Sequence, residues 1–112
     1  MSHHLSESQV LRSILDYLAV NRIYAVRMNS GSIVGERNGN RYRIGMHEAG
    51  TADILAFVYN GAGEGFLPVW IEVKGPKGKQ SDLQKSFQAR VTAEGMRYIL
   101  AYSIDDLIKE GI

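Results

Sequence analysis

The feature that most constrains the fold of this chain is a pair of runs rich in β-branched and aromatic residues, at positions 51–59 and 66–74. Only a short glycine-rich connection separates them, so they predict neighbouring antiparallel strands. A third run, at 97–102, follows a helical pattern at 81–94. A strand that returns to its sheet through a helix lies parallel to its neighbour, because parallel pairing needs a crossover of that length. The pattern therefore predicts an α/β fold with a mixed sheet.

Helices frame this sheet. Apolar residues recur at helical spacing across 7–20, which is typical of an amphipathic helix packed on a core. Ser6 and Gln9 match a capping box at its start. Ser103 is expected to cap a short helix at the C-terminal end.

A hairpin is expected ahead of the central strand pair. Residues 23–28 have strand composition, and the runs 32–36 and 41–45 flank Asn38 and Gly39. An Asn-Gly pair between two such runs is the strongest short-range hairpin signal. We expect the core to follow the order α-β-β-β-α-β-α.

Composition excludes several classes of protein. The 112 residues suit one domain, expected to span residues 1–112. The absence of cysteine excludes disulfide scaffolds, thiolate zinc sites and cysteine nucleophiles. No apolar run approaches the roughly 20 residues that cross a bilayer, and the first residues lack the pattern of a secretory signal. These features predict a cytoplasmic protein with no membrane partner.

The charge is unevenly distributed along the chain. The net charge is +1, from 13 Lys+Arg against 12 Asp+Glu. Segment 22–43 contains five arginines and one glutamate, and segment 72–90 contains five basic and two acidic residues. Either a basic face that binds nucleic acid or solvated strand edges and a solvated helix surface accounts for this distribution.

Three charged residues are expected to meet at one end of the central strand pair. Asp53 lies near the start of the first strand, and Glu72 and Lys74 lie at the end of the second. Alternation along a strand places Glu72 and Lys74 on the same face. Two carboxylates bind a hard cation such as Mg²⁺, and an ammonium group stabilises charge on a phosphate during its hydrolysis. The alternative is a surface ion pair with no chemistry.

Four segments occur in order along the chain: Gly50-Thr51-Ala52-Asp53, Ile71-Glu72-Val73-Lys74-Gly75-Pro76, Ser81-Asp82-Leu83-Gln84, and Gly95 before a hydrophobic strand. Together they resemble the VRR-NUC family, a branch of the PD-(D/E)xK nuclease superfamily, over nearly the whole chain. Ala52 stands where the superfamily name has proline, a position that carries no chemistry. The resemblance implies a restriction-endonuclease-like core, with a mixed β-sheet flanked by helices.

The resemblance also implies roles for individual residues. Asp53 and Glu72 would bind Mg²⁺ or Mn²⁺ together with the backbone carbonyl of Val73, and Lys74 would be the catalytic lysine. Glu7 matches an acidic residue on the first helix that binds the metal directly or through water. Its alternative role is a favourable negative charge at a helix N-terminus.

Gln84 has two possible roles. It matches a family glutamine that supports the lysine or approaches the DNA, so the resemblance implies that Gln84 belongs to the catalytic group. Ser81 and Gln84 also form a capping box, in which the glutamine has a purely structural role. Both roles remain open at the level of sequence.

Further basic and polar residues are candidates for contact with DNA. Arg27 and Asn29 lie where small members of the family carry a similar stretch near the DNA, although an ordinary turn explains them equally well. Lys77 and Lys79 follow the strand that carries Glu72 and are expected to contact phosphates.

The sequence therefore predicts a Mg²⁺- or Mn²⁺-dependent, structure-selective DNA endonuclease. Stand-alone family members suggest a phage or bacterial enzyme that acts on branched DNA and resolves four-way (Holliday) junctions as a homodimer. A dimer interface is expected either at Phe66, Leu67 and Trp70 or around Tyr17 on the first helix. Two other hypotheses are a catalytically silent nuclease-fold module that binds DNA and an unrelated α/β protein.

Overall fold

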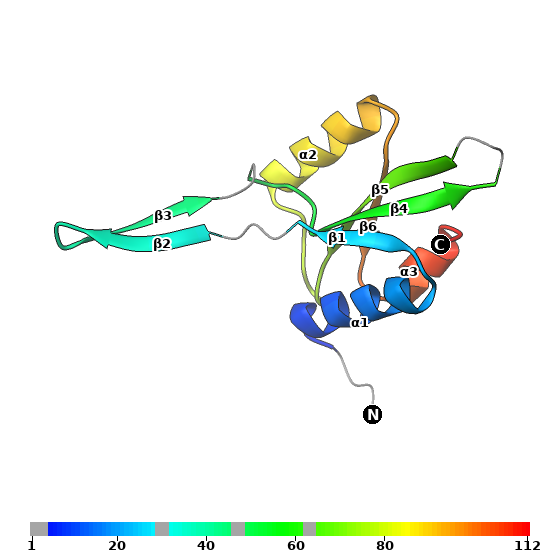
Figure 1. The fold of residues 1–112 in the computed structure, drawn as a ribbon, viewed down its shortest axis with the longest axis horizontal. Coiled ribbons are helices and arrows are strands. Elements are labelled where there is room, and N and C mark those ends of the chain that lie inside the picture. The colour runs from blue at the N-terminus through cyan, green and yellow to red at the C-terminus, as the bar shows by residue number, and fades with distance from the viewer. Residues whose placement is uncertain (1–4, 29–31, 46–48, 62–64) are drawn as a thin grey trace.

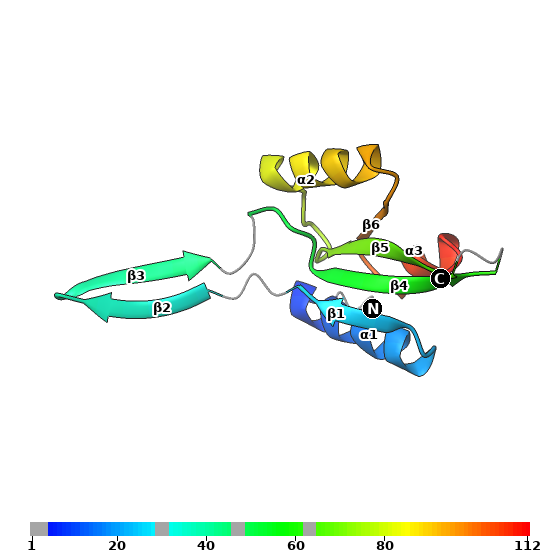
Figure 2. The same ribbon diagram turned by 45° about the horizontal axis from the view of Figure 1, so that its top comes forward.

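The computed structural model of the chain describes residues 5–28, 32–45, 49–61 and 65–112. Nine elements follow one another: α1 (Glu7–Val20), β1 (Tyr24–Arg27), β2 (Ser32–Arg37), β3 (Asn40–Gly45), β4 (Ile54–Asn60), β5 (Gly65–Val73), α2 (Asp82–Ala93), β6 (Arg97–Ala101) and α3 (Ile104–Lys109). The sheet of the main body has the strand order β1-β4-β5-β6. Helices α1 and α2 lie on opposite faces of this sheet (Figure 1, Figure 2).

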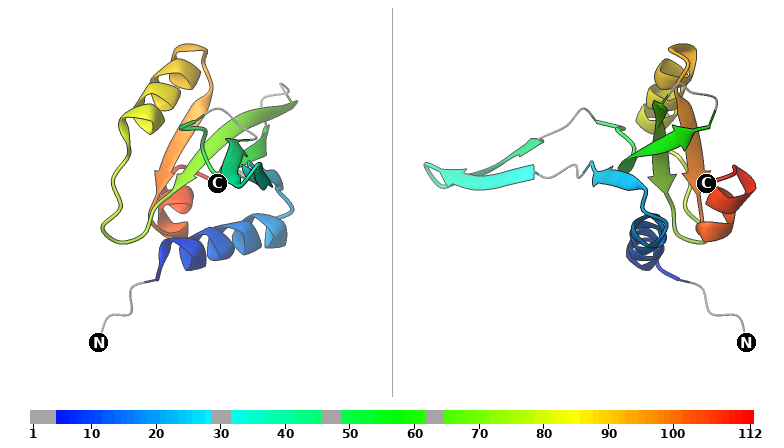
Figure 3. Two further views of the ribbon diagram at one scale, coloured as in Figure 1. Left: turned by 90° about the vertical axis from the view of Figure 1, so that its left-hand side faces the viewer. Right: turned by 45° about the vertical axis from the view of Figure 1, so that its right-hand side comes forward.

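The pairing within the sheet is mixed, as the sequence predicts. β4 pairs antiparallel with both β1 and β5, whereas β5 and β6 are parallel. The parallel pair is joined through α2, which crosses one face of the sheet (Figure 3). Four strands flanked by helices confirm the mixed α/β class.

Strands β2 and β3 form a separate two-stranded ribbon. Asn38 and Gly39, with φ angles of 54° and 79°, form the predicted turn, because both central residues of such a turn need positive φ. Neither strand contacts another helix or strand within the described residues, and Figure 1 shows the ribbon extending away from the body. Without the ribbon, the remaining elements follow the expected order α-β-β-β-α-β-α.

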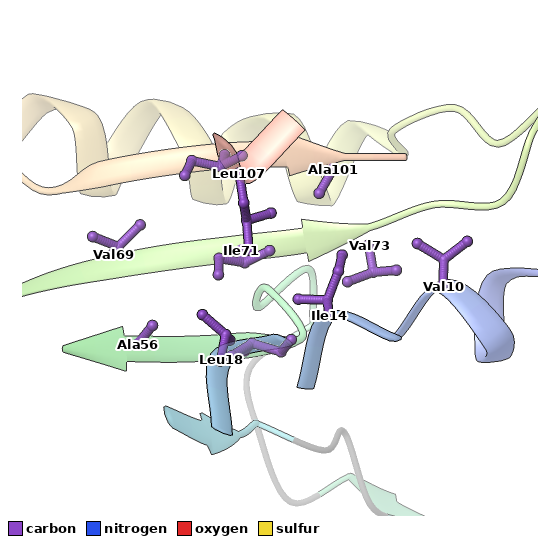
Figure 4. Packing of buried hydrophobic residues seen from close by; sticks show 11 residues of the cluster. Val10, Ile14, Leu18, Ala56, Val69, Ile71, Val73, Ala101 and Leu107 are labelled. Carbon is purple, nitrogen blue, oxygen red and sulfur yellow. The ribbon is translucent and has the colours of Figure 1, made fainter. Parts of the chain in front are cut away.

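The larger core lies between the sheet and helices α1 and α3. Side chains of α1 point toward those of β4 and β5 (Figure 4). Its buried members are Val10, Ile14, Leu18, Ile54, Ala56, Val69, Ile71, Val73, Ile99, Ala101 and Leu107. A smaller cluster beneath α2 contains Ala52, Phe87 and Val91. These two clusters fix both helices on the sheet by burial of apolar surface.

The ends of the helices agree with the sequence in part. The capping boxes of Ser6 and Ser81 are both formed, with their glutamine partners. Gly95 follows α2 with a φ of 87°, a conformation that favours glycine. Ser103 begins α3 as expected, but its side chain makes no capping hydrogen bond.

Gly50 fixes the approach to β4. Its φ is 90°, and a Cβ at this position would lie 2.6 Å from the carbonyl carbon of Leu83 on α2. The backbone before Asp53 therefore packs directly against the first turn of α2. Only glycine allows both the φ angle and this close approach.

We expect Gly50→Ala to lower the free energy of unfolding by about 2–4 kcal/mol, because it combines an unfavourable φ with a backbone clash. Gly61→Ala is the matched control, since that position has open space and no positive φ. The control should change stability by less than about 0.5 kcal/mol. Equilibrium unfolding in urea measures both, and equal stabilities of the two variants would contradict the role of Gly50.

Candidate active site

The ends of three elements position the acidic residues. Asp53 directly precedes β4, and Glu72 is the penultimate residue of β5. Their neighbours Ile54 and Ile71 are register partners, so the two acidic residues meet at the same end of the antiparallel pair. The start of α2 covers this end from one face, through Gln84.

Glu72 is a buried carboxyl group. Its side chain is 1% exposed, although it belongs to the residue types that are most often on the surface. The side-chain amide of Gln84 donates to both of its oxygens, at 3.0 Å to Oε1 and 3.3 Å to Oε2. The group is thus held in place by a neutral partner rather than a cation.

Asp53 is fixed by the backbone of the neighbouring strand. Its Oδ2 accepts a hydrogen bond of 2.7 Å from the backbone N–H of Val73. The backbone carbonyl of Asp53 in turn accepts a hydrogen bond of 2.7 Å from the N–H of Met28, just beyond β1. Both bonds fix Asp53 next to Glu72. The role of the Val73 carbonyl as a metal ligand remains a prediction.

The pKa of Glu72 is raised from 4.5 to about 8. Burial is the largest cause, because it removes water from the charged form. The negative charge of Asp53 and a hydrogen bond to it act in the same direction, as does the charge of Glu7. Lys74 opposes them, since its positive charge lowers the pKa of Glu72. All four charged groups therefore belong to one electrostatic neighbourhood.

Lys74 lies one residue beyond the end of β5 and is half-buried. Its backbone N–H donates to the carbonyl of Ala101 at 3.0 Å, which continues the β5–β6 pairing. A Cβ added to Gly78 would lie 3.1 Å from both Cβ and Cδ of Lys74. The turn closed by the bond from the Gly78 N–H to the Gly75 carbonyl therefore packs against the lysine stem and limits its rotation.

Gln84 has the capping role that the sequence left open, and it also contacts Glu72; its role beside the lysine or the DNA stays a prediction. The side-chain Oε1 of Gln84 accepts a hydrogen bond of 2.8 Å from the backbone N–H of Ser81. The backbone N–H of Gln84 donates to the Ser81 hydroxyl at 3.2 Å. The remaining amide nitrogen holds Glu72. One side chain thus caps α2 and connects that helix to β5.

Glu7 lies at the border of this site. It is exposed in the first turn of α1, and its backbone nitrogen would lie 3.2 Å from a Cβ on Gly75. Across the described ranges, no group of three or more His, Cys, Asp and Glu side chains is arranged to hold a metal. The described arrangement brings two carboxylates together, and the role of Glu7 at the metal, direct or through water, stays a prediction.

Three of the four candidate DNA-binding residues lie within the described part of the chain, and all three are exposed. Arg27 is exposed at the end of β1, where it pairs in register with Ile54. Lys77 and Lys79 are exposed on the loop between β5 and α2. Asn29 lies outside the described residues.

Tyr98 is an addition that the sequence reasoning missed. Its hydroxyl accepts a hydrogen bond of 3.1 Å from Gln80, which also donates to Gln88. Burial raises the pKa of Tyr98 to about 12, and the charges of Glu72 and Asp53 contribute to that rise. Alternation along β6 places Tyr98 on the face of the sheet that α2 covers. This alternation is the sequence signal from which the position of Tyr98 near the site could be predicted.

Two residues of the expected dimer surfaces make contacts within the chain. The indole N–H of Trp70 donates to the Met96 sulfur at 3.3 Å, and its ring packs edge-on against Phe87. The Tyr17 hydroxyl donates to the carbonyl of Ile112 at 2.6 Å. Phe66 is 65% exposed.

Comparisons of the chain with protein families, with curated proteins and with solved structures find no match. Within the described residues, no helix is long and apolar enough to cross a membrane. The site is therefore interpreted from its own geometry.

The raised pKa of Glu72 makes stability depend on pH. The unfolded chain releases this proton near 4.5, whereas the fold retains it up to about 8. Between these values the folded state binds more protons, so the stabilisation is complete below about 4.5 and is lost as the pH rises through 8. In the variant Glu72→Gln, the new side chain resembles protonated glutamate, because it can accept a hydrogen bond from Gln84 and donate one to Asp53.

In the presence of EDTA, we expect the melting temperature of Glu72→Gln relative to wild type to rise by several degrees between pH 5 and pH 9, since about 1 kcal/mol corresponds to 4–8 °C in a domain of this size. All other titrating groups are shared, so the difference isolates Glu72. Melting curves with a constant difference across this range would contradict the assignment.

Proposed function

We propose that this protein is a metal-dependent DNA endonuclease whose site contains Asp53, Glu72 and Lys74. The observation that carries the proposal is the buried carboxyl of Glu72, placed beside Asp53 at the end of two paired strands. Two adjacent carboxylates repel each other, and burial increases the cost of charging both. Either a proton or a cation offsets this repulsion.

The donor set fits Mg²⁺ or Mn²⁺. Such ions prefer oxygen ligands, and Mg²⁺ is commonly held by one or two carboxylates together with water and substrate phosphate rather than by a complete protein cage. Asp53 and Glu72 would hold the ion, and Val73 and Glu7 are proposed as further contributors. A bound divalent cation supplies polarisation of the phosphodiester and a lowered pKa of water.

The residues of the chain have separate tasks in this proposal. Gln84 keeps both oxygens of Glu72 in one orientation. The Lys74 ammonium, with its stem against Gly78, neutralises charge that develops on the phosphate. Lys77 and Lys79, exposed on the adjacent loop, hold the DNA backbone through its phosphates without reading bases.

The substrate that we propose is branched DNA, cut by a symmetric homodimer. The described residues of one chain form one such site, whereas resolution of a four-way junction needs two cuts related by symmetry. A two-fold dimer provides two sites at a fixed separation. Phe66 and Leu67, exposed at the far end of β5, are candidates for the interface together with Trp70, and the surface of α1 around Tyr17 is the alternative. Sedimentation tests whether the dimer forms.

The first test is cleavage of linear, flapped, splayed and four-way DNA with Mg²⁺ or Mn²⁺ by wild type, Asp53→Asn and Glu72→Gln. We expect metal-dependent cleavage by wild type and its loss in both variants, because each removes a charge that holds the cation. Variant rates within tenfold of wild type would contradict the metal site. Metal-independent DNA binding without cleavage by wild type would instead support a silent binding module.

The second test separates the lysine from the metal. Lys74→Met keeps the packing of the stem but removes the ammonium, so the single-turnover rate at saturating metal should fall by about 10²–10³-fold. Metal affinity, measured by calorimetry, should remain within a few-fold. Lys109→Met, on the exposed end of α3, serves as the control and should cleave like wild type. An undiminished rate in Lys74→Met would assign the lysine a structural role.

A further inference from the structure

A groove of about 220 Å³ lies between α1 and the sheet, on the side away from α2. Its lining consists of Ser8, Leu11, Arg12, Leu15 and Arg27. β1 is the edge strand of the sheet, so nothing in the sheet order lies beyond Arg27 on that side. The two leucines form an apolar part of the lining, and the two arginines bring positive charge to it.

The charge of this groove is not neutralised within the described part of the chain. Arg12 and Arg27 are both exposed, and neither makes an ion pair or hydrogen bond with another described residue. Among the residues that the structure describes, no carboxylate belongs to the lining. Asp16 lies one turn further along α1, beyond ion-pair distance of Arg12. Two guanidinium groups that share one groove without a counter-ion favour an anionic ligand.

The groove and the acidic site lie at the same end of the sheet but on opposite faces. Glu72 is held on the α2 face by Gln84, whereas the groove lies against α1. Ser8 follows Glu7, whose backbone nitrogen lies close to Gly75, the second residue of the loop that begins with Lys74. Arg27 is the register partner of Ile54, the residue after Asp53. Both sides of the groove therefore reach the end of the sheet at which Asp53 and Glu72 lie. A DNA strand that crosses this end can place one phosphate at Asp53 and Glu72 and another phosphate in the groove.

We infer that Arg12 and Arg27 together hold a single backbone phosphate of the DNA strand, on the α1 face of the sheet at the end that contains Asp53 and Glu72. This inference rests on the proposed function and makes both arginines positioning residues. Arginine suits the task because its planar, permanently charged group forms paired hydrogen bonds with phosphate oxygens. Since both arginines hold the same phosphate, loss of either one weakens the same contact.

The test measures binding of a short fluorescein-labelled DNA duplex in EDTA by fluorescence anisotropy, as a function of salt. The variants are Arg12→Gln, Arg27→Gln and the double variant, which keep much of the side-chain length. Lys109→Gln removes a charge on α3, outside the groove, and is the control. Each single variant should weaken binding about 10-fold at low salt and reduce the salt slope by about one unit, the value for one phosphate.

The double variant decides whether one phosphate is shared. Its salt slope should also fall by about one unit, because the second substitution removes no further contact. A loss near two units would show two separate phosphates and overturn the shared site. Slopes equal to that of the control would place the DNA elsewhere.

Metal binding and cleavage keep this result separate from the proposed function. Calorimetry with Mn²⁺ alone should give the same affinity for wild type and the double variant, because no metal ligand is changed. Failure of wild type to cleave any DNA would contradict the nuclease proposal, yet the salt slopes would still decide the role of the groove. Arg12→Lys adds a further check: it keeps the charge but loses paired hydrogen bonding, so its affinity should lie between those of wild type and Arg12→Gln.

Discussion

The two hydrogen bonds from Gln84 to Glu72 join the parts of the molecule on which the candidate site depends. A carboxyl group that is 1% exposed needs partners for its oxygens, since an unsatisfied polar group in the interior is costly. Gln84 supplies them while its other atom caps α2, so the position of that helix depends on the end of β5. Gly50, which lets the chain before Asp53 pack against the same turn of α2, completes the connection.

Local signals explain why much of this arrangement could be predicted from the sequence. A capping box involves residues three positions apart, so the starts of α1 and α2 are visible in the sequence. Alternation and an antiparallel connection bring Asp53 and Glu72 to one end of their strands. The crossover through α2 makes β6 parallel to β5 by chain length alone. None of these inferences needs knowledge of long-range packing.

The features that were not predicted depend on contacts between distant parts of the chain. Trp70 has the composition of an interface residue, but its indole is satisfied by Met96 and packs on Phe87, both far along the chain. Gln80, in the loop before α2, donates a hydrogen bond to the hydroxyl of Tyr98, on the strand that follows α2. The ribbon of β2 and β3 has an ordinary hairpin sequence, and nothing in it indicates that the two strands leave the main sheet.

The burial of Glu72 also distinguishes the hypotheses that the sequence left open. A surface ion pair requires exposed charges within about 4 Å of each other, and such pairs contribute little to stability. Glu72 is buried, and within the described residues it has no ion pair with Lys74. Its hydrogen-bond partner on α2 is a neutral amide, and its pKa is raised by burial and by the neighbouring Asp53. An arrangement of this kind reduces stability at neutral pH, whereas a hydrophobic side chain in the same place would not. The cation binding that we propose accounts for an acidic pair that does not stabilise the fold, and this reasoning holds for a binding module as well as for an enzyme. Lys74 favours the enzyme, because its ammonium opposes metal binding by charge repulsion but stabilises a phosphate that is losing its ester bond.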